Sequence, residues 1–277
     1  MATVAFWGIR DGQVATTSNL IATATNIGMN TPIKTLITHT HWRKTTLENS
    51  YKKPVDSNHL SHSFTDYGID ALERLAKSNR LTPESIRDNT TPLIKGHLDM
   101  LYGTTKPDQD FHEQLIQAVP AILRNAENYY DLTLIDVPSG VTNELTKTVL
   151  QESDLVVVCL NQNLTVLNSF FENKEYPEIL NQKEHLFVLG KYDDQSKYSV
   201  KNIQRKYRLK NKIYTVPHCS SFLDATNDSN VLDFFLRNRH ISSSHENSSF
   251  FAEVNKLSRA ISAKLDLKLG RLESGGE

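Results

Sequence analysis

The chain has 277 residues, of which 38% are hydrophobic and 23% charged, and its formal net charge is −1. This balance is ordinary for a globular protein with a sizeable core, and it gives no overall electrostatic basis for wrapping nucleic acid or coating an anionic membrane. The two cysteines, Cys159 and Cys219, argue against a disulfide framework and favour a reducing compartment.

No apolar run approaches the roughly 20 residues that a membrane-spanning helix needs. The first apolar stretch, residues 3–7, is also too short for the apolar part of a signal peptide. We therefore expect a cytoplasmic protein.

Short β-branched and apolar runs alternate along the chain with segments of helical periodicity. The runs expected as strands are residues 4–7, 33–38, 132–136, 155–160, 186–189 and 213–216. The segments expected as helices are residues 16–27, 69–77, 111–128, 142–151 and 200–207. Because strands that alternate with helices need right-handed crossovers, the sequence predicts an α/β protein whose doubly wound, mainly parallel sheet lies between two helix layers.

We expect one domain over residues 1–277. The segment from about 42 to 105 is rich in polar residues and prolines, so it is expected to be an irregular insertion with short helices. A last helix is expected at about 247–267. Its apolar residues repeat at helical spacing, which is typical of a helix that packs on the sheet; because basic residues lie between them, an amphipathic helix at a membrane surface is the alternative.

The loop after the first predicted strand is the first place to look for a ligand, because open α/β sheets bind ligands beyond the carboxyl ends of their strands. Residues 8–19 read Gly-Ile-Arg-Asp-Gly-Gln-Val-Ala-Thr-Thr-Ser-Asn. A glycine-containing turn before a helix offers backbone N–H groups to an anion. A working phosphate loop also needs a lysine for the β- and γ-phosphates and a hydroxyl for Mg²⁺.

The lysine is missing from this loop. Against the pattern Gly-Gly-Val-Gly-Lys-Thr, the chain keeps three residues and places Thr16 where the lysine belongs. A shift of one residue places Ala15 there instead, so the loss does not depend on register. The residues predicted to bind a nucleotide are Gly12, Gln13, Val14, Ala15, Thr16 and Thr17; the alternative is a helix start with no ligand.

The ends of two other predicted strands also bear on a nucleotide site. One keeps the residues that such a site needs, and the other does not. Residues 134–140 match a strand-ending Asp-x-Pro-x-Gly motif, in which Asp136 would hold Mg²⁺ through water and Gly140 would let the backbone approach the γ-phosphate. After the second predicted strand, Thr38 and Thr40 stand where two aspartates would orient water and metal, and neutral threonines supply no such charge. Gly190 likewise replaces an asparagine that would contact adenine.

Together these motifs resemble the ParA/MinD branch of P-loop NTPases over most of the chain. Within that branch, the segments 6–7, 12–13, 16–20, 36–41 and 213–217 are similar to degenerate TadZ/CpaE-like proteins of Gram-positive bacteria. The resemblance implies a homodimer with little or no ATP hydrolysis and no catalytic residue. It further implies weak binding of ATP or ADP, with Mg²⁺ on Thr17 and Asp136 only when nucleotide is present.

The same resemblance implies a localisation or assembly factor for a pilus or secretion system, at the cell pole or the membrane periphery. A DNA-partition-type ATPase is the second reading, with Arg10 or a partner's basic residue in place of the lysine. The basic residues Lys201, Arg205, Lys206, Arg208, Lys210 and Lys212 would then bind DNA in a salt-sensitive way. A nucleotide sensor whose output is dimerisation is the third.

Four histidines have spacings that suit metal binding, namely His39, His41, His59 and His62. No acidic or cysteine ligand accompanies them at a matching spacing. We therefore expect polar loop histidines near a strand end.

Overall fold

The computed structural model describes residues 1–42, 45–52, 67–104, 109–172 and 176–267. Over these residues, one eight-stranded sheet has the order β3-β4-β2-β5-β1-β6-β7-β8. The strands are β1 (Ala2–Gly8), β2 (Thr35–His39), β3 (Thr91–Ile94), β4 (Leu98–Met100), β5 (Leu132–Asp136), β6 (Leu155–Leu160), β7 (Glu184–Tyr192) and β8 (Ile213–Pro217). Neighbouring strands are parallel except for β3 and β4.

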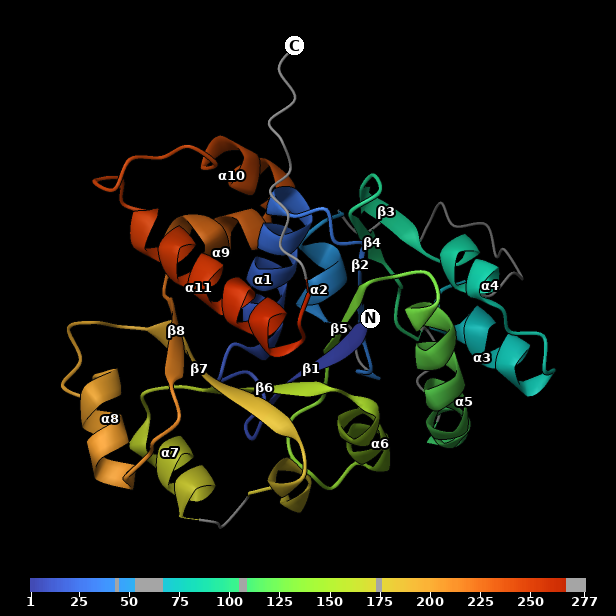
Figure 1. Ribbon diagram of the computed structural model, residues 1–277, viewed down its shortest axis with the longest axis horizontal. Coiled ribbons are helices and arrows are strands. Elements are labelled where there is room, and N and C mark those ends of the chain that lie inside the picture. The colour runs from blue at the N-terminus through green and yellow to red at the C-terminus, as the bar shows by residue number, and fades with distance from the viewer. Residues whose placement is uncertain (43–44, 53–66, 105–108, 173–175, 268–277) are drawn as a thin grey trace.

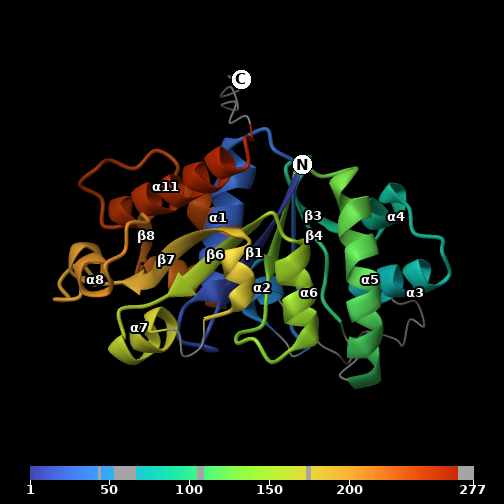
Figure 2. The ribbon, with the colours of Figure 1, turned by 60° about the horizontal axis from the view of Figure 1, so that its bottom comes forward.

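Helices cover both faces of the sheet (Figures 1 and 2). One layer holds α1 (Thr16–Asn30), α2 (Thr46–Asn49), α9 (Ser220–Asn227), α10 (Val231–Arg237) and α11 (Ser248–Lys264). The other holds α3 (Ile69–Lys77), α4 (Pro83–Asp88), α5 (Gln109–Glu127), α6 (Glu144–Glu152), α7 (Leu164–Phe171), the 3₁₀ turn η1 (Glu178–Asn181) and α8 (Val200–Tyr207). The predicted α/β class, with its doubly wound and mainly parallel sheet, is confirmed.

The central strands explain why the sheet was predictable. All residues of β1, β5 and β6 are buried, and a parallel strand that is covered on both faces has a continuous apolar sequence instead of an alternating one. The register brings Phe6 beside Asp136 and Gly8 beside Cys159. The end of β1 and its following loop therefore lie between the carboxyl ends of β5 and β6.

The segment 42–105 contains more regular structure than the sequence indicates. In addition to short helices, it supplies β3 and β4, an antiparallel hairpin that extends the sheet beyond β2. Its turn places Gly96 at a φ of 80°. β4 has only three residues, one of them Asp99, and the residues of β3 are partly exposed, so neither strand has a recognisable apolar pattern. The division of the chain into domains stays a prediction.

The last helix packs on the sheet, as expected. Phe250, Val254, Leu257 and Ile261 of α11 are buried, and the helix lies against β8 and α1. Its apolar face is therefore covered by protein, so the amphipathic-helix alternative would require α11 to leave the sheet. Within the part of the chain described above, no helix combines the length and apolarity that crossing a bilayer demands.

Candidate functional site

The loop from β1 to α1 has a backbone that only small or glycine residues adopt readily. Gly12 has a φ of 68°, with open space around its α-carbon, and Ala15 is left-handed at a φ of 59° and a ψ of 33°. A left-handed conformation costs a non-glycine residue roughly 1–2 kcal/mol. Ala15 thus occupies a glycine-type position, which supports the register in which Thr16 stands at the place of the phosphate-loop lysine.

The side chain of Thr16 contacts the protein interior. Its hydroxyl lies beside the Cys159 thiol, whose pKa is raised to about 12 by burial against a smaller lowering by Asn19 and Thr16. Val14 is buried over Gly8, where an added β-carbon would come within 2.4 Å of its Cγ2 and 3.0 Å of Thr16 Oγ1. Position 16 therefore contributes a neutral hydroxyl to the base of the loop, and no cation to a bound anion.

Asp136 is the centre of the polar contacts at this edge of the sheet. The Thr17 hydroxyl donates a hydrogen bond to Asp136 Oδ2 at 2.7 Å, and His41 Nε2 lies 3.3 Å from the same oxygen. The side chain of Asp136 is fully buried, and among the described residues its Oδ1 has no hydrogen-bond partner. One carboxylate oxygen is therefore held in place, while the other is buried and accepts no hydrogen bond from the described residues.

His41 is the residue at this site that the sequence interpretation missed. Burial of its imidazole opposes protonation, but the contact with Asp136 and the charges of Asp136 and Asp11 outweigh it, so the pKa of His41 is raised. The signal lay in the strand order: β2 pairs with β5, with His39 opposite Asp136. A residue two positions beyond His39 therefore reaches the end of β5.

A chain of contacts runs from His41 through His39 and Glu48 to Gly103, which follows β4. The His41 N–H donates to His39 Nδ1 at 3.2 Å, and His39 Nε2 lies 3.1 Å from Glu48 Oε1. Glu48 also accepts from the Gly103 N–H at 2.8 Å. Although burial opposes ionisation of Glu48, these partners outweigh burial and lower the pKa of its carboxyl. This network fixes the end of β2 beside the loop.

The two threonines at the expected acidic positions are buried. Thr38 and Thr40 are each 4% exposed, and their hydroxyls have no hydrogen-bond partner within the described segments. Carboxylates at such sites would need charged partners to offset desolvation. Neutral side chains fit there, and they supply no base or metal charge.

Gly140 and Gln13 line the same edge through their backbones. Gly140 has a φ of 81° with open space beside it, its N–H donates to Gly8 O at 3.1 Å, and its carbonyl accepts from Trp7 Nε1 at 2.8 Å. The carbonyl of Gln13 accepts from Asn161 Nδ2 at 3.3 Å. The segments after β5 and β6 therefore brace the loop.

Gly190 has a packing role that the sequence did not reveal. A β-carbon at this position of β7 would lie 2.7 Å from Val14 O and 2.9 Å from Ala15 Cβ. A side chain here would strike the loop instead of reaching a ligand. The glycine is therefore required by the close approach of the loop to β7.

The side-chain oxygen atoms at this site suit Mg²⁺ better than the loop suits a polyphosphate. The unpartnered Asp136 Oδ1 and the Thr17 hydroxyl are hard oxygen ligands of the kind that Mg²⁺ takes. The loop offers a phosphate its backbone N–H groups and the positive end of α1. Because position 16 adds no positive charge, these residues fit a nucleotide and Mg²⁺ that bind weakly.

No group of three or more His, Cys, Asp or Glu side chains that could hold a metal ion occurs among the residues for which the structure gives positions. His39 and His41 lie together, with ring centroids 5.8 Å apart. His59 and His62 lie outside the described residues.

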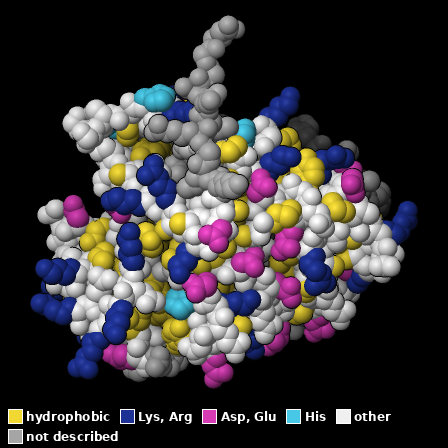
Figure 3. Space-filling model, in the orientation of Figure 1, with side chains coloured by type: hydrophobic (Ala, Val, Ile, Leu, Met, Phe, Trp, Pro, Cys, Tyr) yellow, Lys and Arg dark blue, Asp and Glu magenta, His cyan; other side chains and the backbone are white. Residues whose placement is uncertain are grey.

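The predicted basic cluster is on the surface. Its six residues are exposed and belong to α8 and the segment that leads into β8. Lys and Arg side chains gather over α8 in the space-filling view (Figure 3). The cluster lies on the side of the sheet that β7 and β8 form, away from α3 and α4.

Comparison with solved structures establishes the type of fold. A ParA family ATPase from Chlorobium tepidum TLS superposes with a TM-score of 0.68 at 12% identity, over 92% of this chain and 96% of that one. The septum site-determining protein MinD from Pyrococcus horikoshii OT3, complexed with Mg-ADP, gives 0.63 at 14% identity, over 95% and 98%. The MinC:MinD cell division complex of Aquifex aeolicus gives 0.66 at 15% identity, over 100% of both chains.

No protein-family model matches the chain, and no curated protein matches it. At 12–15% identity, the structural similarity supports the fold alone. The chain has the P-loop NTPase fold of ParA and MinD proteins, as the sequence predicts.

Proposed function

We propose that the chain is a barely hydrolysing or non-hydrolysing protein of the ParA/MinD fold that positions or assembles a larger complex. The observation that carries this proposal is the side chain at position 16. A neutral hydroxyl that lies beside Cys159 and Gly8 stands where an extended lysine would reach the phosphates. Loss of one pre-organised charge at a reacting phosphate typically removes about 3–4 kcal/mol of transition-state stabilisation, which is a factor of several hundred in rate.

The neighbouring side chains support the proposal, because none of those named here replaces the charge of the missing lysine. Thr38 and Thr40 are neutral and buried, and His41 is engaged with Asp136 and His39. Arg10 is partly buried in the loop. The partition-type alternative relies on Arg10, or on a basic residue of a partner subunit, to replace the lysine. ATP or ADP with Mg²⁺ would contact the loop backbone at residues 12–17, with the metal on Thr17 and Asp136.

We propose that such a protein acts by assembling with other proteins. MinD, whose fold this chain shares, forms a complex with MinC in Aquifex aeolicus. We propose that this chain also recruits partner proteins, and that it does so as a homodimer. The TadZ/CpaE-like motifs support pilus or secretion machinery as the partner. A nucleotide-sensing dimer is the variant of this proposal in which bound nucleotide controls the assembly.

Phosphate release from ATP by the full chain tests the proposal. We expect no Mg²⁺-dependent release above the rate of a denatured sample. Turnover that needs Mg²⁺ and disappears in Asp136→Ala would sink the proposal, because that variant removes the carboxylate expected to hold the metal.

DNA binding is a second candidate function, favoured by the exposed basic cluster around α8. Fluorescence anisotropy with a random duplex should show binding that falls steeply between about 50 and about 200 mM salt. Replacement of Lys201, Arg205 and Lys206 by glutamate should abolish this DNA binding. Binding that ignores salt or these substitutions would rule this function out.

A further inference from the structure

A cavity of about 1130 Å³ lies at the end of α1 opposite to the loop. Its walls come from the last turns of α1, the connection between α10 and α11, and the first half of α11. Because α1 has 15 residues, its two ends lie roughly 22 Å apart. The cavity is therefore separate from the candidate nucleotide site.

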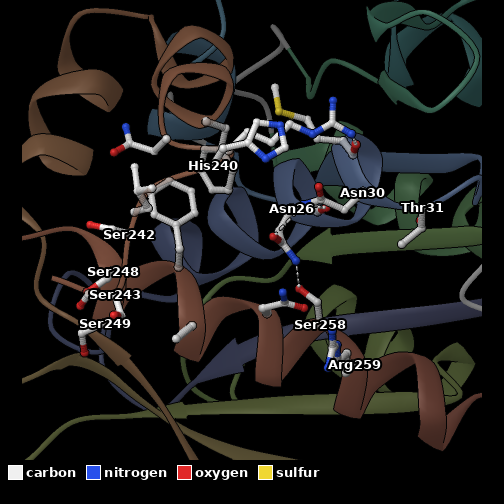
Figure 4. Close-up of a pocket in the computed structure, with 18 residues that line it drawn as sticks. Asn26, Asn30, Thr31, His240, Ser242, Ser243, Ser248, Ser249, Ser258 and Arg259 are labelled. Atoms are coloured by element: carbon white, nitrogen blue, oxygen red, sulfur yellow. Dashed lines mark hydrogen bonds between the residues drawn. The ribbon is translucent and has the colours of Figure 1, made fainter. Parts of the chain in front are cut away.

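The cavity wall is rich in donors and carries positive charge. Arg239 and Arg259 line it together with His240, and none of its described lining residues is acidic. Ser242, Ser243, Ser248 and Ser249 add hydroxyls, which lie together at one wall (Figure 4). A site with two guanidinium groups and no carboxylate favours an anionic ligand.

The floor of the cavity is polar although it is buried. Asn26 of α1 is 5% exposed and Ser258 of α11 is 3% exposed. Asn26 Nδ2 donates to Ser258 Oγ at 3.0 Å (Figure 4), and Asn30 Nδ2 donates to Asn26 Oδ1 at 3.0 Å. Because these buried polar groups are hydrogen-bonded to one another, the floor is both polar and held in place.

The start of α11 adds to the positive potential of the wall. The side chain of Asn247 makes no capping hydrogen bond to the helix, and the first turn has no acidic residue. Asn247 instead donates from Nδ2 to Asn238 Oδ1 at 3.1 Å. The first turn of this 17-residue helix thus offers no charge to offset its positive end, and the nearest acidic residue in the sequence is Glu246, just before Asn247.

We infer that this cavity binds a small organic phosphate. Arg239 and Arg259 supply the positive charge that attracts the phosphate group, and the hydroxyls at the serine wall, together with Asn26 and Ser258, offer hydrogen bonds to the rest of the ligand. The volume is sufficient for a sugar phosphate or a mononucleotide. Mg²⁺ has no part in this binding, because the lining residues that the structure describes offer no carboxylate.

Isothermal titration of the full chain in EDTA tests the inference. The probes are glucose 6-phosphate and AMP, with glucose and adenosine as their uncharged counterparts. At least one phosphate should bind, and its counterpart should not. Arg239→Gln and Arg259→Gln should each weaken binding about tenfold or more.

Arg237→Gln is the matched control. Arg237 lies close in sequence but outside the cavity lining, and it pairs with Asp233 at 2.6 Å. It should leave the affinity unchanged, and thermal melting should show that all three variants are folded. Three outcomes would overturn the inference: no binding of either phosphate, equal binding of the uncharged counterparts, or equal weakening by all three substitutions.

Discussion

Thr17 Oγ1 lies 2.7 Å from Asp136 Oδ2, so a hydrogen bond joins the first turn of α1 to the end of β5 across 119 positions of sequence. The bond connects the loop after β1 with the segment that begins at Asp136, the two motifs from which the sequence predicts a phosphate site. It also orients the buried carboxylate so that Asp136 Oδ1 stays without a partner among the described residues.

Thr17→Val should lower the free energy of unfolding by about 1 kcal/mol, because it removes the hydroxyl that donates to a buried carboxylate. Urea unfolding of the purified chain measures this difference. Thr148→Val is the matched control: Thr148 is partly exposed on α6, its hydroxyl donates to Glu144 O of the same helix, and the substitution should change stability by less than about 0.5 kcal/mol. Equal effects of the two substitutions would contradict the structural role of the Thr17 bond.

Ala15→Gly should raise the free energy of unfolding by about 0.5–1 kcal/mol. Glycine relieves the left-handed strain at a φ of 59°, and its greater freedom in the unfolded chain offsets part of the gain. Thermal melting tests this prediction. Ala260→Gly, inside α11, should instead lower stability by about 1 kcal/mol; a loss of stability in both variants would show that position 15 is not strained.

Gly190→Ala should lower the free energy of unfolding by about 1–3 kcal/mol, because its β-carbon meets the carbonyl oxygen of Val14 at 2.7 Å. Gly12→Ala has open space and suffers only from its φ of 68°, so its loss should be about 1–2 kcal/mol. Crystal structures of both variants would separate the two causes. Only Gly190→Ala should displace the loop, and an undisturbed loop would refute the packing role.

Glu48→Gln should make stability less dependent on acid pH. The pKa of Glu48 is lowered in the folded chain, so its ionised form stabilises the fold above its ordinary value of 4.5, and this contribution is lost as the pH falls through the lowered value. We expect the variant to be roughly 1–2 kcal/mol less stable at pH 7. Unfolding between pH 7 and pH 3 should show this deficit shrinking below about pH 4.5.

Glu152→Gln, at an exposed position of α6, is the control for this pH series. It should differ from the wild type by less than about 0.5 kcal/mol at pH 7. A deficit of Glu48→Gln that stays constant down to pH 3 would contradict the paired state of Glu48.

The parts of the fold that could be predicted are those in which burial dictates the sequence. β1, β5 and β6 are covered on both faces, and their apolar runs made them recognisable. β3 and β4 pair at the edge of the sheet, where short and partly exposed strands need no such run. Their pairing depends on neighbours that are far apart in sequence.

The candidate site was predictable where backbone geometry requires a motif. The loop glycines and the Asp136 segment stood out for that reason, and the structure brings Thr17 and Asp136 into contact. The contact of His41 with Asp136 depends on the order of β2 and β5 in the sheet. The close approach of the loop to Gly190 likewise appears only when β7 is in place.

The central claim is that the loop after β1 lacks the lysine that would hold the phosphates, because Thr16 stands in its place. Isothermal titration with ATP and Mg²⁺ should compare the wild type with a variant that carries Gln13→Gly, Ala15→Gly and Thr16→Lys. We predict that the variant binds ATP at least tenfold more tightly, because the lysine adds a charge-assisted contact to the phosphates. Equally tight binding by the wild type would contradict the account.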